Sequence, residues 1–220
     1  MMKNIKNIFA VALTLVLLSV MLCLSACGGM TLKESGGMGA VDKESGVVWK
    51  HASTCYEAIT LGDKVGKLKV TDKQSLDLHE IEDMDAASWL ATEEGHVLYA
   101  EGTHLPTLPE MKPTAMLVCV ENETTKVLCN VQEAEKINAV VAAFSEGESV
   151  TYPAKGILRT YRVRFTSPDY AGMYYTLTYV EYADDYVLDN VNHGKYFLYN
   201  AFDQIFVPVG EEIHAALGLD

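Results

Sequence analysis

The stretch RTYRVRFTSPDYAGMYYTLTYVEY, residues 159–182, decides the fold of the C-terminal half of the chain. Its two ends, RTYRVRFT (159–166) and MYYTLTYVEY (173–182), are rich in aromatic and β-branched residues, which favour the pleated surface of a sheet. The segment TSPDYAG between the two runs has the composition of a loop. The stretch therefore predicts two antiparallel strands joined by a short connection.

Pairing these strands through the loop predicts which side chains share a face. We expect the pairs Val163–Tyr175, Tyr161–Leu177 and Phe165–Met173 on the apolar side that faces the core. The other side then presents Arg162, Arg164, Tyr174, Thr176 and Thr178. Two guanidiniums beside a tyrosine ring and hydroxyls can bind an anionic sugar or a peptide carboxylate, so this face is the predicted ligand-binding platform. Two alternatives stay open: the arginines pair with nearby carboxylates, or the C-terminal helix covers the face.

The segments around this hairpin extend the same pattern. MLVCVENETTKVLCNV (116–131) predicts a second hairpin around a polar turn. QEAEKINAVVAAF (132–144) predicts a helix because its apolar residues recur at helical spacing, and Gly147 follows as a stop signal. Two further strands and a final helix are predicted in KYFLYN (195–200), QIFVPVG (204–210) and EEIHAAL (211–217). The predicted fold class is α+β, with a mostly antiparallel β-sheet and a few short helices.

Three cysteines remain outside the first 27 residues, Cys55, Cys119 and Cys129. A three-residue loop from 123 to 125 in the second hairpin would place Asn122 opposite Lys126 and Cys119 opposite Cys129. Opposed positions at a non-hydrogen-bonded site can bring two Cβ atoms within bridging distance, so Cys119 and Cys129 are a candidate disulfide.

The N-terminal half is predicted to be a smaller β-rich unit. KVGKLKV (64–70), LDLHEI (76–81) and HVLYAEG (96–102) favour strands, and DAASWLA (85–91) favours a short helix with Asp85 as its N-cap. This arrangement loosely resembles small β-rich modules of uncharacterised surface lipoproteins from Gram-positive bacteria, a resemblance that implies no activity. Three prolines, Pro106, Pro109 and Pro113, disfavour both a helix and a central strand in residues 103–115. We therefore expect a β-rich domain over 47–102, a Pro-rich connection over 103–115 and an α+β domain over 116–220.

The first 46 residues predict export and anchoring. Lys3 and Lys6 precede an apolar run that ends near residue 22, and small residues follow, which is the layout of a secretory signal. The residues LSAC (24–27) resemble the lipobox of bacterial lipoproteins, which implies a signal peptide over 1–26, lipidation of Cys27 and a membrane partner reached through that lipid. The glycine-rich and charged stretch that follows predicts a flexible tether over 27–46. The expected location is the cell membrane, lipid-anchored on the extracytoplasmic face.

The net charge of the chain limits the classes of partner that it is expected to bind. The formal net charge is −13, and loss of the two signal lysines makes it about −15. Such a chain repels nucleic acid and anionic headgroups, so neither is an expected partner. The remaining candidate partner is a glycan or protein of the cell envelope.

No motif assigns a chemistry. The six histidines do not occur at H-x-H or H-E-x-x-H spacing, and neither a phosphate-binding glycine loop nor a nucleophile elbow is present, so no catalytic residue, metal or cofactor is predicted. The predicted function is a non-enzymatic binding or scaffolding protein of the envelope. The alternative is an envelope hydrolase that acts through carboxylates, or an accessory subunit of an envelope enzyme or transporter.

Overall fold

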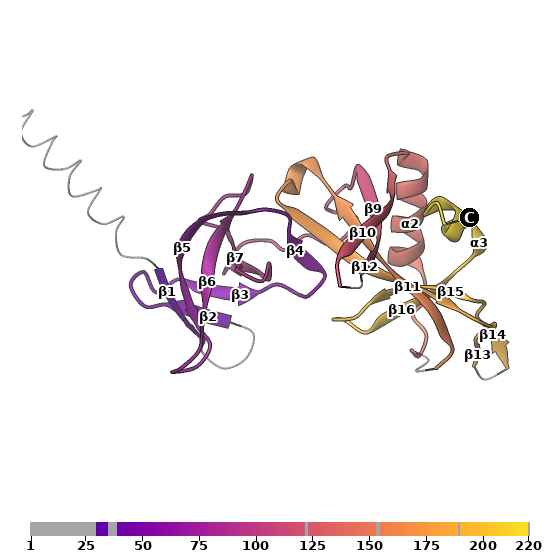
Figure 1. Ribbon diagram of the computed structural model, residues 1–220, viewed down its shortest axis with the longest axis horizontal. Coiled ribbons are helices and arrows are strands. Elements are labelled where there is room, and N and C mark those ends of the chain that lie inside the picture. Colours follow the sequence, from indigo (N-terminus) through magenta and orange to yellow (C-terminus); the bar gives the residue numbers. More distant parts are fainter. Residues whose placement is uncertain (1–29, 35–38, 122, 153–154, 189, 220) are drawn as a thin grey trace, which may run out of the picture.

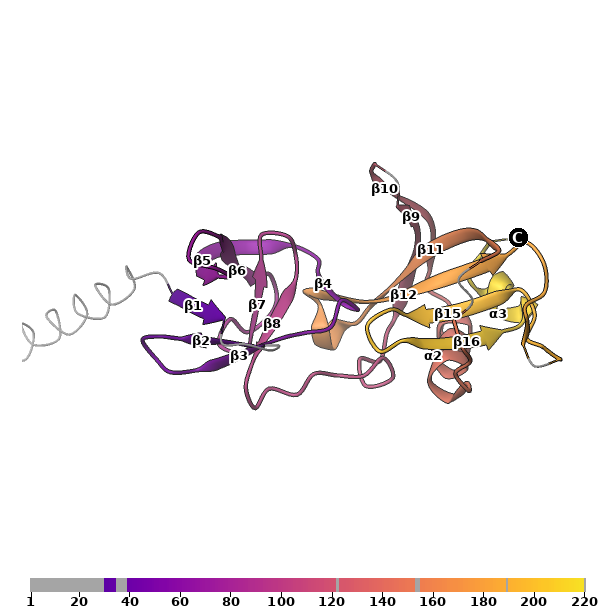
Figure 2. The ribbon, with the colours of Figure 1, turned by 90° about the horizontal axis from the view of Figure 1, so that it is seen from below.

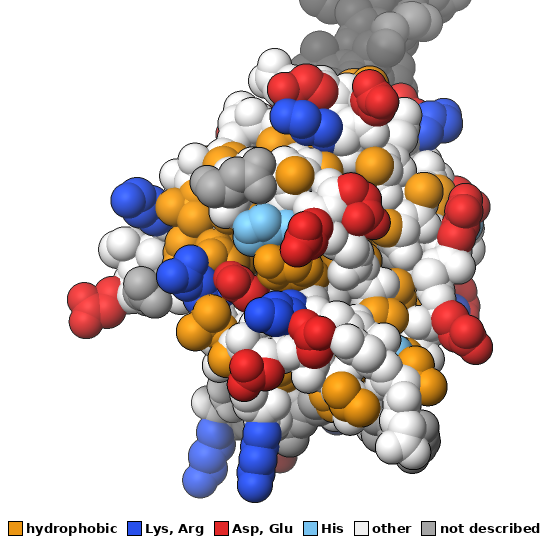
Figure 3. Space-filling view, turned by 90° about the vertical axis from the view of Figure 1, so that its right-hand side faces the viewer, with side chains coloured by type: hydrophobic (Ala, Val, Ile, Leu, Met, Phe, Trp, Pro, Cys, Tyr) orange, Lys and Arg blue, Asp and Glu red, His pale blue; other side chains and the backbone are white. Residues whose placement is uncertain are grey.

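A computed structural model of the chain describes residues 30–34, 39–121, 123–152, 155–188 and 190–219. It places a closed barrel beside an open sheet, with two helices packed on the sheet (Figure 1). The two parts follow one another along the long axis of the molecule, and the barrel comes first in the chain (Figure 2). On the face seen along this axis from the sheet half, acidic and basic side chains are interspersed (Figure 3).

Seven strands in the order β1-β2-β3-β8-β7-β6-β5 close the barrel. Their side chains alternate between the interior and the outside, as period-2 patterning requires. The interior is filled by a compact apolar cluster that includes Leu32, Trp49, Leu68, Leu78, Leu90 and Leu98. The strands are β1 (Met30–Glu34), β2 (Gly39–Asp42), β3 (Val48–His51), β5 (Leu61–Lys69), β6 (Ser75–Ile81), β7 (Trp89–Thr92) and β8 (Val97–Ala100).

The barrel closes where β1 runs parallel to β5. Met30 lies opposite Gly66 at this seam, and a Cβ atom at position 66 would collide with the carbonyl of Met30. Gly66 therefore permits the close backbone approach that joins the first strand to the rest of the barrel.

The expectation of a flexible tether over 27–46 is wrong for the residues that form β1 and β2. Leu32 and Ala40 are completely buried in the barrel interior, so among the described residues the folded structure already includes Met30–Glu34 and Gly39–Asp42 rather than starting near Val47. Gly39, one of the glycines that suggested flexibility, lies within β2, which pairs with β1 and β3. The predicted signal peptide and Cys27 lie outside the described residues.

The second half of the chain forms an open sheet in the order β10-β9-β11-β12-β15-β16, to which β4 adds by pairing with β12. No helix or strand lies between Ala100 and Ala115. The strands of this sheet are β4 (Tyr56–Ala58), β9 (Ala115–Glu121), β10 (Thr125–Val131), β11 (Ile157–Thr166), β12 (Met173–Tyr182), β15 (Tyr196–Asn200) and β16 (Ile205–Val209). A 3₁₀ turn η1 (Pro168–Tyr170) and a small hairpin of β13 (Val187–Leu188) and β14 (Val191–Asn192) complete the strand connections.

Helices α2 (Ala134–Glu146) and α3 (Glu211–Ala216) cover one face of this sheet. The apolar stripe of α2, predicted from its spacing, buries Ile137, Val140 and Phe144. These residues pack with Val163 and other inward side chains of the sheet in one core, which also includes Ile81, Trp89 and Val97 from the barrel. The barrel therefore contributes side chains to the core of the sheet, in addition to the separate cluster that fills its own interior.

The predicted register of the central hairpin is wrong by two residues. Val163 lies opposite Leu177 instead of Tyr175, and Phe165 lies opposite Tyr175. The connection contains the η1 turn, which shifts the pairing. Because a shift of two keeps each side chain on its own face, the predicted division into an apolar and a polar face still holds.

The second hairpin also departs from its predicted register. Cys119 lies opposite Val127, and an irregularity in β10 then places Cys129 opposite Val118. Neither cysteine forms a disulfide, and Cys55 is also a free thiol. The candidate Cys119–Cys129 bridge is therefore not present in this structure.

The predicted helix over 85–91 is a turn followed by β7. The carboxylate of Asp85 accepts hydrogen bonds from the Ala87 backbone N–H at 3.1 Å and from the Ser88 hydroxyl at 2.8 Å, as an N-cap would. Trp89 then enters a strand in which every residue is buried. Asp85 therefore caps a turn as its sequence context predicts. Strand pairing in the barrel overrides the helix propensity of the residues that follow it.

The α+β fold class is confirmed in its coarse form, with strands predominating over helices. The antiparallel expectation is confirmed in part, since the barrel depends on the parallel β1–β5 pair. In the described part of the chain, no helix is long and apolar enough to cross a membrane.

Candidate functional site

The predicted platform is assembled by the sheet. Arg162 and Arg164 lie on β11 opposite Thr178 and Thr176 of β12, on the face away from the helices. The guanidinium of Arg164 lies 5.5 Å from the ring centre of Tyr174. The five residues therefore come together as predicted, and the C-terminal helix does not cover them.

Both guanidiniums form ion pairs with carboxylates. Glu121 of β9 contacts Arg162 Nε at 3.1 Å through one oxygen and Arg164 Nη2 at 2.8 Å through the other. Glu57 of β4 contacts the same guanidinium through one oxygen, 2.8 Å from Arg164 Nη2 and 2.9 Å from its Nε. Two positive and two negative groups form one chain, so an anionic ligand would have to displace Glu57 or Glu121.

This ion-pair chain has an evident structural role. It joins the end of β9 to β4. In the sequence β4 lies between the barrel strands β3 and β5, but it pairs with the sheet. Thr176, also predicted as a ligand contact, is 3% exposed, so its hydroxyl is not available at the surface. Of the two alternatives to a ligand platform, the structure therefore matches the one in which the arginines pair with nearby carboxylates.

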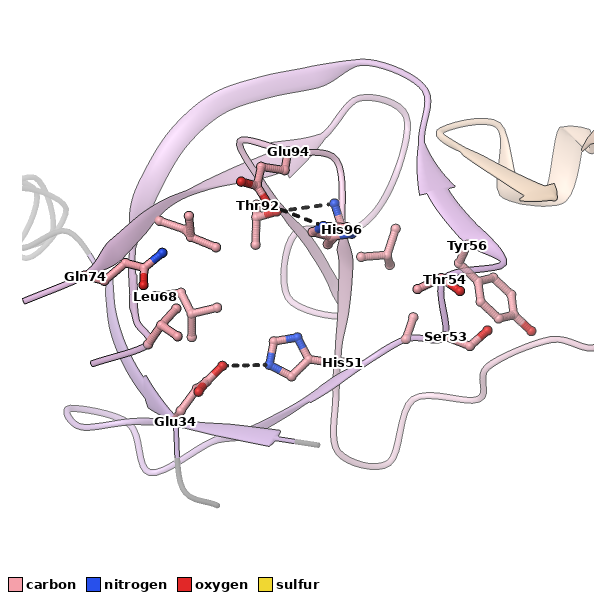
Figure 4. Close-up of a pocket in the computed structure, with 14 residues that line it drawn as sticks. Glu34, His51, Ser53, Thr54, Tyr56, Leu68, Gln74, Thr92, Glu94 and His96 are labelled. Carbon is pink, nitrogen blue, oxygen red and sulfur yellow. Dashed lines mark hydrogen bonds and ion pairs between the residues drawn. The ribbon is translucent and has the colours of Figure 1, made fainter. Parts of the chain in front are cut away.

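The mouth of the barrel offers a different kind of site. Strands of alternating direction bring the ends of β1, β3, β5 and β7 together with the starts of β6 and β8. Figure 4 shows the resulting hollow, which has a volume of about 340 Å³. Leu68, Val70, Leu76 and Val97 supply its apolar lining, and Ser53, Thr54 and Gln74 add polar groups.

Two histidine–glutamate pairs lie on the rim of this barrel-mouth pocket. His51 Nε2 lies 3.7 Å from Glu34 Oε1, and His96 Nε2 lies 3.3 Å from Glu94 Oε2 (Figure 4). The His51 pair is partly buried, with 28% of the imidazole side chain exposed, whereas the His96 pair is open to solvent. Each carboxylate keeps a second oxygen that its histidine contact does not use.

The turn that carries His96 is held rigidly. Thr92, itself 1% exposed, accepts a hydrogen bond from the His96 backbone N–H through its hydroxyl at 3.3 Å and donates its own N–H to the His96 carbonyl at 2.9 Å. Gly95 closes the turn with a φ of +84°, a conformation that favours glycine. The His96 side of the rim is therefore held in place by hydrogen bonds, which lowers the entropic cost of ordering it on binding.

The chemistry of the pocket favours recognition. Among the described residues, neither imidazole is hydrogen-bonded to a hydroxyl or thiol side chain, the contact that activates a nucleophile. No group of three or more His, Cys, Asp or Glu side chains in the described ranges is arranged to hold a metal ion. The pocket offers apolar contact, two carboxylates and a few hydrogen-bonding groups.

The sequence did not indicate this site, because its residues come from seven strands and the loops between them and form no motif. Glu34 lies inside the predicted tether, and the spacing of the histidines predicts no catalytic or metal site. The structure places His51 at the last residue of β3 and His96 directly before β8.

None of the family models, curated proteins or solved structures compared with this chain matches it.

Proposed function

We propose that this protein is a lipid-anchored, non-enzymatic binding protein of the cell envelope, and that its ligand binds in the barrel-mouth pocket. The observation that carries the binding role is the pocket itself, a preformed hollow of about 340 Å³ at one end of a closed barrel. Barrel mouths and volumes of this order are typical of small-molecule sites. The anchor is supported by the LSAC motif that ends at Cys27 and by the signal-like residues before it.

The lining of the pocket favours a small ligand with an apolar body and an ammonium group. Leu68, Leu76 and Val97 would contact the apolar body, while Glu34 and Glu94 would attract the positive charge. The net charge of −13 adds a field that concentrates cations and repels anions. This proposal reverses the charge of the ligand expected on the arginine face, where the guanidiniums are already neutralised.

A matched ligand series tests the pocket. Isothermal titration calorimetry compares pentylammonium, pentanol and pentanoate, three probes that share an apolar chain and differ in charge. We expect affinity to fall in that order, because only the ammonium gains from the rim carboxylates. Equal affinity for all three would reject the charge preference, and no binding of any probe would reject the pocket as the site.

Charge-matched variants locate the effect. Glu34→Gln and Glu94→Gln should each weaken pentylammonium binding about three- to fivefold, the range of a solvent-accessible charge pair. Glu135→Gln, on the exposed surface of α2, changes the net charge equally and should leave the affinity unchanged. A loss of affinity in all three variants would point to the overall field instead of the pocket.

The anchor has its own test. Metabolic fatty-acid labelling should mark the wild-type chain and disappear in Cys27→Ala, because the thiol is the acceptor. Labelling that persists in the variant would contradict the lipidation of Cys27.

A further inference from the structure

A second cavity lies away from the barrel mouth, where the C-terminal end of α2 meets residues 107–109 and the ends of β12, β15 and β16. This junction cleft has a volume of about 570 Å³. Its walls combine apolar side chains from Leu108, Phe144 and Ile205 with the polar ends of Tyr175, Asn200 and Asp203. None of these six residues belongs to the arginine face or lines the barrel-mouth pocket; Tyr56, a further residue of the cleft, lines both cavities.

Asn200 organises the polar side of the cleft. It is 1% exposed, and its amide oxygen accepts hydrogen bonds from the backbone N–H groups of Phe202 at 3.0 Å and Asp203 at 3.1 Å. The thiol of Cys55 donates to the same oxygen at 3.0 Å. A buried amide with this many partners cannot rotate without leaving some of them unsatisfied, so its orientation is fixed.

The amide nitrogen of Asn200 in turn orients the two groups that face the cleft. It donates to Asp203 Oδ2 at 2.8 Å and to the Tyr175 hydroxyl oxygen at 3.4 Å. Because that hydroxyl oxygen accepts from Asn200, its own proton points elsewhere and is available to a ligand. Burial raises the pKa of Tyr175, which keeps the phenol protonated as a donor.

The carboxylate and the phenol therefore present complementary hydrogen-bonding groups side by side. Asp203 retains an oxygen that Asn200 does not use and can accept from a hydroxyl group, while Tyr175 can donate to one. Ser149, whose hydroxyl accepts from the Phe206 backbone N–H at 3.1 Å, lines the same cleft and keeps its proton for a further acceptor. A simple ammonium ligand could use only the carboxylate and would leave both donors unpaired.

The apolar walls complete the recognition surface. Tyr56 packs edge-on against Tyr175, with ring centres 5.2 Å apart, and its own hydroxyl donates to the Pro106 carbonyl, which leaves its ring as an apolar surface. Phe144 and Leu108 add further apolar side chains to the lining of the same cleft. A sugar ring carries hydroxyl groups at its edge and apolar C–H groups on its faces. It can therefore contact polar and apolar walls at the same time, which most small polar molecules of similar size cannot do.

We propose that the junction cleft binds a neutral saccharide, with the carboxylate of Asp203 accepting hydrogen bonds from ring hydroxyls and the Tyr175 hydroxyl donating to one. The Asp203 charge and the acidic surface disfavour uronic acids and other anionic sugars. This proposal concerns a different cavity from the barrel-mouth pocket, and its test does not depend on the proposed function.

Saturation-transfer NMR on the full chain tests the proposal with a defined probe set. The set contains neutral hexoses and N-acetylhexosamines with their disaccharides, together with glucuronic acid and pentylammonium. We expect ring protons of at least one neutral sugar to receive saturation, and glucuronic acid to receive none. Absence of transfer to every neutral sugar, or stronger transfer to glucuronic acid, would overturn the proposal.

Two conservative variants assign the binding to the cleft. Asp203→Asn should weaken the bound sugar about tenfold, and Tyr175→Phe should weaken it about fivefold while preserving the ring. Asp184→Asn and Tyr170→Phe make the same chemical changes outside the cleft and should have no effect. Sugar affinity that is unchanged in both cleft variants, or lowered equally in the controls, would contradict the assignment.

Discussion

Replacing Leu32 by alanine tests whether the stretch that resembles a tether is part of the barrel. Leu32 is completely buried and packs in the same interior cluster as Trp49 and Leu68. Leucine-to-alanine changes at such positions cost about 2–5 kcal/mol, because they lose the transfer free energy of the deleted groups and leave a cavity. With an m-value of about 2–3 kcal/mol/M in urea, the unfolding midpoint should fall by about 0.7–2.5 M.

The assay is equilibrium urea unfolding followed by tryptophan fluorescence. The chain has two tryptophans, and both are buried: Trp49 lies in the barrel interior with Leu32, and Trp89 lies in the core that the barrel shares with the sheet, so their emission reports the loss of both cores. Lys33→Ala is the matched control, because Lys33 is exposed on the same strand and its change should stay within about 0.5 kcal/mol. If Leu32→Ala and Lys33→Ala shift the midpoint equally little, residues 30–34 are not part of the folded barrel.

Three further outcomes follow from the described contacts. Arg164→Met should lower the free energy of unfolding by about 1–2 kcal/mol in chemical denaturation, because its side chain is 17% exposed and its loss leaves the Glu57 carboxylate without a basic partner and Glu121 with Arg162 alone. Arg162→Met should cost under about 1 kcal/mol, because Arg162 is more exposed; equal effects would reject the inferred chain. The Ser45 hydroxyl lowers the pKa of the Asp42 carboxyl, so this carboxyl contributes stability above about pH 4 that is lost as pH falls through its folded pKa. Asp42→Asn should therefore flatten the acid limb of a thermal stability profile, and an unchanged limb would contradict this. Under native conditions a maleimide reagent should modify the partly exposed Cys129 and leave the buried Cys119 unmodified until denaturant is added; early modification of Cys119 would place it at the surface.

The elements that could be predicted are those whose own residues determine them. The strand over Met173–Tyr182 agrees with its predicted range from end to end, because its aromatic and β-branched residues favour only a strand. The α2 helix was predicted from its apolar spacing for the same reason. In both cases the local signal and the tertiary packing agree.

The elements that could not be predicted depend on distant partners. Nothing within the residues of β1 favours a strand over a coil, and its place is decided by pairing with β5 more than thirty residues later, where Gly66 allows the approach. The register of the central hairpin depended on the conformation adopted by Pro168–Tyr170, which composition alone does not fix. Asp85 illustrates the converse, a true local cap followed by a segment that the barrel requires as a strand.

The candidate sites were also beyond the sequence. The arginine face could be grouped correctly because period-2 alternation places Arg162 and Arg164 on one side, but the carboxylates that neutralise them come from β4 and β9. The barrel-mouth rim and the junction cleft combine residues from across the chain, and no spacing relates them. Such convergence appears only when the topology is known.

The central claim is that the barrel-mouth pocket binds a small ammonium ligand, and the imidazole resonances of the rim test it most directly. We expect titration with pentylammonium to produce saturable shifts in the ring signals of His51 and His96, which line the pocket. His104 is exposed outside the pocket beside Glu110 and should not shift, so it serves as an internal reference. Shifts that are absent at His51 and His96, or that are equal at all three histidines, would contradict the account.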